Sequence, residues 1–243
     1  MFVICSNPLI IKNNYDHCFI TNDFLYDRAP SFPDFVMAQF FEIHPDNPQR
    51  RLIQQAVAII DRGGLVIYPT DSSYALGCHI GDKNAMERIQ RIRRTDSKHH
   101  FTLVCSDLSE IGTYAKVDNS DYRLMKSLTP GPYTFLLPAT SVVPRRLMNP
   151  KRKTIGVRVP DNNIVHALLS ELGQPIMSST LIPPGATEAL DDAVEIREAF
   201  EHDVDLVIDG GFCGVEPTTV ISLIDGYAEI LRHGKGDVAF LEE

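Results

Sequence analysis

Apolar positions recur at short, regular intervals along most of this chain, and their spacing predicts its elements. Short apolar runs bounded by Gly, Pro or acidic residues indicate strands, whereas inward positions three to four residues apart indicate helices. Nine strands are expected: QFFEI (39–43), GLVIY (64–68), FTLVC (101–105), PYTFLLPA (132–139), TIGVRVP (154–160), QPIMSSTL (174–181), DLVIDG (205–210), TTVISLI (218–224) and YAEILR (227–232).

Helices are expected over 46–61, from residue 82, over 161–172 and over 191–202, with two short ones after residues 107 and 118. Four of these helices are expected to begin after an N-cap Asp, at positions 46, 82, 107 and 118. Strands and helices mix without strict alternation, and the late strands follow one another. This favours an α/β fold with a twisted mixed (parallel and antiparallel) open sheet and helices packed on it.

The first 36 residues differ from the rest, because they show no clear period and carry Pro30 and Pro33. The segment MAQFFEIHPDNPQRR (37–51) then resembles a natural N-terminus. The sequence therefore predicts a poorly ordered N-terminal extension over 1–36 and one domain over 37–243. The alternative is that MFVICS (1–6) docks as a strand on a sheet edge.

The composition, 44% hydrophobic and 23% charged, is that of an ordinary globular protein. No apolar run approaches the roughly 20 residues of a membrane helix, and the N-terminus lacks the features of a secretory signal. The five cysteines form no C-x-x-C pair, which argues against a structural zinc site or a disulfide framework. These features predict a cytoplasmic protein that is not associated with a membrane.

The charge is uneven along the chain. The net charge is −9, but residues 83–98 carry a local +4 and residues 145–158 a local +6, so the remainder sums to −19. An acidic protein that concentrates its cations in two stretches can hold an anion there. Two solvated basic surfaces explain the same pattern equally well.

Hydroxyl and carboxylate side chains crowd the end of the strand GLVIY. Residues 70–74 read TDSSY, directly after Pro69. Groups at the carboxyl end of a buried strand lie where open sheets bind ligands. The alternative is that Asp71 or Ser72 simply caps a helix.

Arg158 is the second unusual position, because it lies in a strand that is otherwise apolar. A charged group there needs a partner. A ligand phosphate or carboxylate fits a guanidinium group, and so does a structural Asp. Three standard site motifs are absent, namely the P-loop, the G-x-G-x-x-G turn and the G-x-S-x-G elbow.

Six stretches, taken in order over about residues 39–238, resemble the YrdC-like family, whose best-known members are threonylcarbamoyl-AMP synthases. They are YPTDSSYALG (68–77), TPGPYT (129–134), IGVRVP (155–160), PIMSST (175–180), PTTV (217–220) and LRHG (231–234). The YciO branch is the most similar, as in RKTIG and MAQFFEIHPDNPQ. The resemblance implies a twisted mixed α/β sheet with a positively charged concave face.

The resemblance also implies a chemistry and its participants. Synthases of the family join L-threonine, bicarbonate and ATP with Mg²⁺ and release pyrophosphate, and other proteins move the product's threonylcarbamoyl group to tRNA. The residues implied to bind threonine or the carbamoyl group are Thr70, Tyr74, Thr134 and Thr180. Those implied to bind the nucleotide or another anion are Arg93, Arg158 and Arg232. Catalysis would rest on positioning and electrostatics, with no protein nucleophile and no protein metal site.

Two departures from the family pattern weaken the synthase expectation. The family's Lys-x-Arg pair aligns with Arg93-Arg94-Thr95, and its Ser-x-Asn pair with Thr180-Leu181-Ile182. A lost charge-assisted hydrogen bond and a lost neutral one together remove roughly 2–4.5 kcal/mol, about 30- to 2000-fold in rate.

Three hypotheses follow from these departures. The first is a weak synthase-like nucleotidyltransferase acting on ATP or a related adenylate. The second is a module that binds double-stranded RNA or tRNA without turnover. The third is a paralogue that binds nucleotide without turnover.

Overall fold

The structure is a computed structural model that describes residues 37–94, 101–149, 151–186 and 188–241. The predicted N-terminal extension and the alternative strand MFVICS lie outside these residues, and so does Thr95. The domain boundary at residue 37 stays a prediction.

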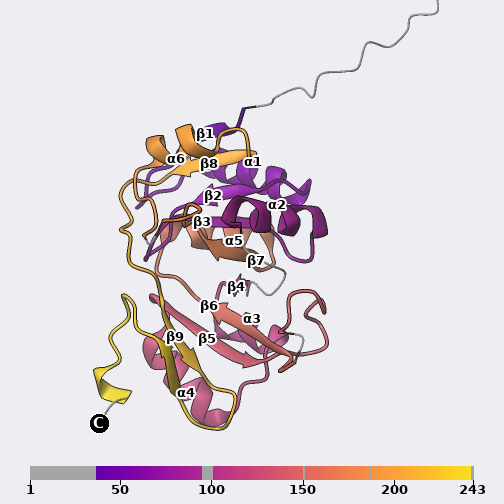
Figure 1. The fold of residues 1–243 in the computed structure, drawn as a ribbon, viewed down its shortest axis with the longest axis vertical. Coiled ribbons are helices and arrows are strands. Elements are labelled where there is room, and N and C mark those ends of the chain that lie inside the picture. Colours follow the sequence, from indigo (N-terminus) through magenta and orange to yellow (C-terminus); the bar gives the residue numbers. More distant parts are fainter. Residues whose placement is uncertain (1–36, 95–100, 150, 187, 242–243) are drawn as a thin grey trace, which may run out of the picture. The chain divides into compact units, whose positions relative to one another are not determined.

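Ten strands form one sheet in the order β1-β8-β2-β3-β7-β4-β6-β5-β9-β10 (Figure 1). The strands are β1 (Gln39–Glu42), β2 (Val66–Tyr68), β3 (Ala75–His79), β4 (Thr102–Val104), β5 (Tyr133–Pro138), β6 (Thr154–Arg158), β7 (Ile176–Thr180), β8 (Leu206–Asp209), β9 (Thr219–Ser222) and β10 (Glu229–Arg232). The pairs β1/β8, β2/β8, β4/β6 and β5/β9 are parallel, and the other five are antiparallel. The predicted mixed open sheet is confirmed.

The nine expected strands are present, and the sequence interpretation missed one. The missed strand, β3, pairs antiparallel with β2 across the TDSSY turn. Residues 70–73 therefore connect two strands, and the alternative that Asp71 or Ser72 caps a helix is wrong.

Six α-helices accompany the sheet in the described ranges, with a short 3₁₀ turn at Ala239–Leu241. They are α1 (Arg50–Asp61), α2 (Lys83–Arg93), α3 (Leu108–Tyr114), α4 (Asn119–Leu128), α5 (Asn163–Leu172) and α6 (Ala193–Phe200). The predicted Asp caps of α2, α3 and α4 each accept a hydrogen bond from a backbone N–H. None of the helices in the described part of the chain has the length and hydropathy of a membrane span.

The predicted cap at Asp46 is wrong, because α1 begins four residues later. Its N-cap is Gln49, which makes no side-chain capping bond. Residues 44–47 instead form a turn in which His44 Nδ1 accepts hydrogen bonds from the backbone of Asp46 and Asn47 at 3.2 Å. A local side-chain acceptor thus stabilises a turn ahead of the helix.

Side chains that alternate along the strands divide the core into two layers. Val66 and Tyr68 of β2 pack with α1 and α5 on one face. Ile67 between them belongs to the other layer, which includes residues of α2, α3, α4 and α6. Each face of the sheet is thus covered by its own set of helices, as the period of two along each strand requires.

The α1/α5 layer covers only part of its face. Residues of β1–β4, β7 and β8, or of the turns beside them, contribute to it, whereas β5, β6, β9 and β10 contribute none. Side chains of β5 and β6 such as Thr134 and Arg158 line an open cavity instead of packing under a helix. This cavity therefore lies on the bare part of this face.

Candidate functional site

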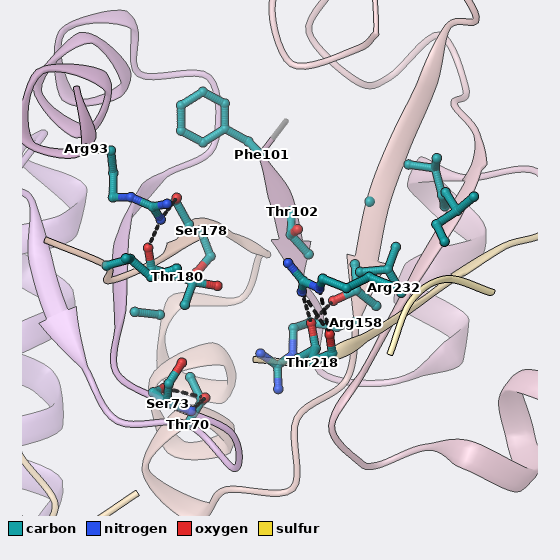
Figure 2. Close-up of a pocket in the computed structure, with 18 residues that line it drawn as sticks. Thr70, Ser73, Arg93, Phe101, Thr102, Arg158, Ser178, Thr180, Thr218 and Arg232 are labelled. Atoms are coloured by element: carbon teal, nitrogen blue, oxygen red, sulfur yellow. Dashed lines mark hydrogen bonds between the residues drawn. The ribbon is translucent and has the colours of Figure 1, made fainter. Parts of the chain in front are cut away.

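A hollow of about 310 Å³ opens on the part of the sheet that α1 and α5 leave uncovered (Figure 2). Its volume is at the low end of small-molecule sites, which span roughly 300–1,000 Å³. Its lining is rich in hydroxyls and arginines: Thr70, Ser73, Ala75, Arg93, Phe101, Thr102, Thr134, Leu136, Gly156, Arg158, Ser178, Ser179, Thr180, Ile182, Thr218, Val220, Leu231 and Arg232. Hydroxyls and guanidinium groups suit a polar ligand with negative charge.

Thr70 organises the turn between β2 and β3. Its hydroxyl donates to the carbonyl of Ser73 at 2.6 Å and accepts from the N–H groups of Ser72 and Ser73 at 3.2 Å. The side chain is buried. Since the hydroxyl is occupied by the turn, Thr70 acts on the hollow chiefly by fixing the backbone of residues 70–73.

Asp71 is the structural partner that Arg158 needed. Arg158 Nη2 forms an ion pair with Asp71, and both side chains are only 9% exposed. The other oxygen of Asp71 accepts from the N–H of Asp161 at 3.0 Å, and Lys235 Nζ donates to the Asp71 carbonyl. Arg158 still reaches the hollow, and its Nε is buried without a hydrogen-bond partner in the described chain.

Arg93 and Arg232 approach the hollow from opposite sides (Figure 2). Arg93, the last residue of α2, donates to the carbonyl of Thr180 and to Ser179 Oγ at 3.2 Å. Arg232 of β10 donates to the Thr218 carbonyl at 2.8 Å. Neither is paired with a carboxylate among the described residues, and burial lowers the pKa of each guanidinium group. An anion between them would restore the favourable environment that burial removes.

Hydroxyls of several strands form the polar floor. Thr134 Oγ1 and Thr218 Oγ1 are 2.9 Å apart, and Ser178 Oγ accepts from Tyr68 at 2.8 Å. Burial raises the pKa of Tyr68 to about 12, which keeps it a neutral donor. Within the described chain, the hydroxyls of Thr102 and Thr180 have no partner. These two strand residues therefore offer free hydroxyls to a ligand.

Gly156 has no side chain and so leaves space at the floor of the hollow. A Cβ atom at this position would lie 3.1 Å from Thr102 Oγ1 and 3.5 Å from Thr134 Cγ2. Any side chain here would crowd both threonines and fill part of the hollow.

Tyr74 is the one predicted binding residue that the structure places elsewhere. Its ring is fully buried in the core layer of α2 and α6, and its hydroxyl donates to the carbonyl of Gly211 at 2.9 Å. Burial raises the pKa of Tyr74, so the hydroxyl stays protonated. Its position indicates that it anchors the loop after β8.

Replacing Tyr74 with Phe should therefore lower stability and leave ligand affinity nearly unchanged. The lost hydrogen bond is worth about 1 kcal/mol of unfolding free energy. The resemblance implies ATP and threonine as ligands, and we expect their Kd values to change by less than about threefold, ~0.6 kcal/mol. Thr180→Val, which also removes one hydroxyl, is the matched comparison and should weaken binding about 2- to 13-fold. A larger loss of affinity in Tyr74→Phe than in Thr180→Val would contradict this placement.

The structure brings the six other predicted binding residues together. All of them line the hollow: Thr70, Arg93, Thr134, Arg158, Thr180 and Arg232.

Sequence reasoning missed three contributors that carry usable signals. Thr102 and Thr218 belong to the lining, the first beside apolar Leu103 in its strand and the second directly before β9. Lys235, which reaches the Asp71 carbonyl, lies in the Gly-Lys-Gly turn after β10. The departure at Ile182 lies in the wall, where it places an apolar side chain.

The donor set of the hollow does not fit a resident metal ion. The carboxylate beside it, Asp71, is committed to Arg158 and to the backbone of Asp161. In the described ranges no cluster of three or more His, Cys, Asp or Glu residues could hold a metal.

The comparisons with known proteins identify the family and the fold of the chain. A family model described as telomere recombination, Sua5/yciO/yrdC, matches residues 58–234. The chain belongs to this family. A threonylcarbamoyl-AMP synthase of Chromohalobacter salexigens is 31% identical over 182 residues, which are 74% of this chain and 96% of that protein.

Solved structures of the family share the fold. The crystal structure of E. coli YciO has a TM-score of 0.81 and 58% identity, covering 84% of this chain and 98% of that one. The structure of P. abyssi Sua5 complexed with L-threonine has a TM-score of 0.71 and 27% identity, covering 80% of this chain and 57% of that one. The predicted YrdC-like fold is thereby confirmed.

Proposed function

We propose that the hollow binds an adenylate and that the protein is a weak threonylcarbamoyl-AMP synthase. The observation that carries this proposal is the pair of arginines, the partly buried Arg93 and the more exposed Arg232, without carboxylate partners in the described chain and facing one polar hollow. The P. abyssi relative complexed with L-threonine and the Chromohalobacter synthase support the choice of substrates.

The chemistry of each lining residue suits a different part of the substrates. The free hydroxyls of Thr102 and Thr180 suit the polar groups of threonine or of its carbamate. Arg93 and Arg232 suit phosphoryl oxygens, on which charge develops as pyrophosphate leaves. Arg158, already paired with Asp71, acts mainly as a fixed support for the turn at residues 70–73.

The reaction needs no protein nucleophile. The threonine amine adds to bicarbonate with loss of water, and the resulting carbamate oxygen attacks the α-phosphorus of ATP, whose bond to pyrophosphate breaks. Burial raises the pKa of Cys213, beside Thr70, to about 12, so this thiol stays protonated. Mg²⁺ would bind together with ATP, held by its phosphates, since the described hollow supplies no metal ligand set.

Arg93→Gln tests the nucleotide part of this proposal. Loss of a charge-assisted hydrogen bond should weaken ATP binding by roughly 1.5–3 kcal/mol, about 10- to 150-fold. Calorimetric titration with Mg-ATP measures the Kd.

Arg91→Gln is the matched control, because Arg91 lies on the same helix but on its exposed side. It should bind ATP like the wild type. Equal Kd values for the wild type, Arg93→Gln and Arg91→Gln would show that the adenylate does not bind in the hollow.

A second candidate function is binding of double-stranded RNA or tRNA. It is favoured by the concentration of cations in an acidic chain, eight Lys and Arg residues with no acid over residues 122–160. Such binding would fall linearly in log[salt], with a slope near one per phosphate contacted. The two functions are compatible, because the first concerns the hollow and the second a larger surface.

A further inference from the structure

We propose that the loop between β5 and β6 binds the phosphate backbone of RNA, as a surface separate from the hollow. This inference rests on the second candidate function and names the residues that would perform it. The loop is described over residues 139–149 and 151–153, and we call it the basic loop. Its five exposed cations are Arg145, Arg146, Lys151, Arg152 and Lys153.

The cations of the basic loop are available for a ligand. None of the five is paired with a carboxylate in the described part of the chain. The ion pairs found there join residues outside the basic loop. The sequence contains no Asp or Glu between Asp121 and Asp161, so the loop carries no acid of its own. A chain of net charge −9 that keeps one loop free of acid presents a local positive field.

Hydrogen bonds to the side chain and carbonyl of Asn149 order residues 151–153 of the basic loop. Asn149 Oδ1 accepts from the N–H groups of Lys151 and Arg152 at 3.0 Å, and the Asn149 carbonyl accepts from the N–H of Lys153 at 2.8 Å. Lys153 has a φ of 53°, a conformation that costs free energy for a residue other than Gly. Cations on an ordered turn lose less entropy on binding than cations on a free tail.

A cavity accompanies the cations. It measures about 690 Å³ and is lined by Ala139, Thr140, Ser141, Val143, Arg145, Met148, Asn149 and Lys153. Two cations and two hydroxyls thus face one concave space. Side chains of these types make most protein contacts to nucleic-acid phosphates.

Of the anionic partners, a nucleic-acid backbone fits this loop best. Five exposed cations exceed what one small phosphate neutralises. A membrane surface would require exposed apolar side chains beside the cations, and Val142 is the loop's one large exposed apolar residue in the described chain. A backbone that repeats its charge at every nucleotide matches several cations at once.

The basic loop and the hollow lie at opposite ends of β6. Lys153 directly precedes this strand and Arg158 ends it, so the two are separated by about 17 Å at ~3.3 Å per residue. That span corresponds to about five phosphates along one strand of a duplex. The two sites share no cation among the described residues, and variants can test them independently.

The test uses the full-length chain and a fluorescent RNA duplex of about 20 base pairs, titrated at several salt concentrations. The loop variant carries Arg145→Gln, Arg146→Gln, Lys151→Gln and Arg152→Gln. We expect its affinity to fall at least about 30-fold and its log–log salt slope to shrink by about 3. The control removes the same charge from exposed positions of α1 and α2 or just beyond α1: Arg50→Gln, Arg51→Gln, Arg62→Gln and Arg91→Gln.

Each outcome decides a separate question. A loss confined to the loop variant supports the proposal. Wild-type affinity in the loop variant, or an equal loss in the control, overturns it. A loss confined to Arg93→Gln with Arg232→Gln keeps RNA binding but moves it to the hollow. Absence of RNA binding in the wild type, or a preference for phosphatidylserine vesicles, overturns the RNA function and the loop's role together, while ATP titration still tests the adenylate.

Discussion

Replacing Asp71 with Ala is expected to lower the free energy of unfolding by about 3 kcal/mol. Removing one partner of a buried ion pair typically costs roughly 3–5 kcal/mol, because the other charge is left uncompensated. The lower end applies here, since Arg158 lies on the wall of a hollow that water can enter. The substitution also takes the acceptor from the N–H of Asp161. Urea denaturation at about 25 °C measures the change.

Two further variants separate the pair from a general effect of charge. Asp71→Ala combined with Arg158→Met should recover part of the loss, because the orphaned charge is gone. Glu87→Ala, which breaks the exposed Lys83–Glu87 pair, should change stability by less than about 1 kcal/mol. A loss below about 1 kcal/mol for Asp71→Ala would show that Arg158 does not depend on this carboxylate.

Introducing Asn at position 182 is expected to raise synthase activity. Ile182 lines the hollow and can neither donate nor accept a hydrogen bond through its side chain. An amide there would add a neutral hydrogen bond of about 0.5–1.5 kcal/mol to the transition state, about 2- to 13-fold in rate. Adding Thr95→Arg should bring the total gain to roughly 30- to 2000-fold. Pyrophosphate release from ATP, threonine and bicarbonate is the measurement.

Ile182→Leu is the matched control, because it keeps an apolar side chain of similar size. Its rate should stay within about twofold of the wild type, ~0.4 kcal/mol. If the Thr95→Arg, Ile182→Asn double variant is no faster than the wild type, these two positions do not limit the reaction.

Much of the sheet could be predicted because its strands are short apolar runs bounded by Gly, Pro or acidic residues. The pattern failed at β3, whose sequence ALGCH directly follows a run of hydroxyls that looks like a helix cap. It failed again at the start of α1, where the N–H groups of Asp46 and Asn47 bond to His44 in a turn and the helix begins only at Arg50. In both places a local hydrogen bond or a tertiary pairing outweighed the intrinsic preference.

The candidate site was predictable only as a set of residues. The motifs indicated which side chains to expect, but not that Asp71 and Arg158, 87 residues apart, form a pair. They also placed Tyr74 with Thr70, although the tyrosine belongs to the opposite core layer. Residue spacing within a turn does not fix the face of the sheet on which each side chain lies.

The order of the segments around the hollow has a consequence for synthesis on the ribosome. The turn at residues 70–73 emerges early, whereas β10, the last strand in sequence, brings Arg232 and is followed by Lys235. A nascent chain can therefore assemble much of the sheet before Arg232, a cation of the lining, has been made. Ligand capture has to wait until translation has passed Arg232, and the buried Val238 shows that residues after β10 also belong to the core.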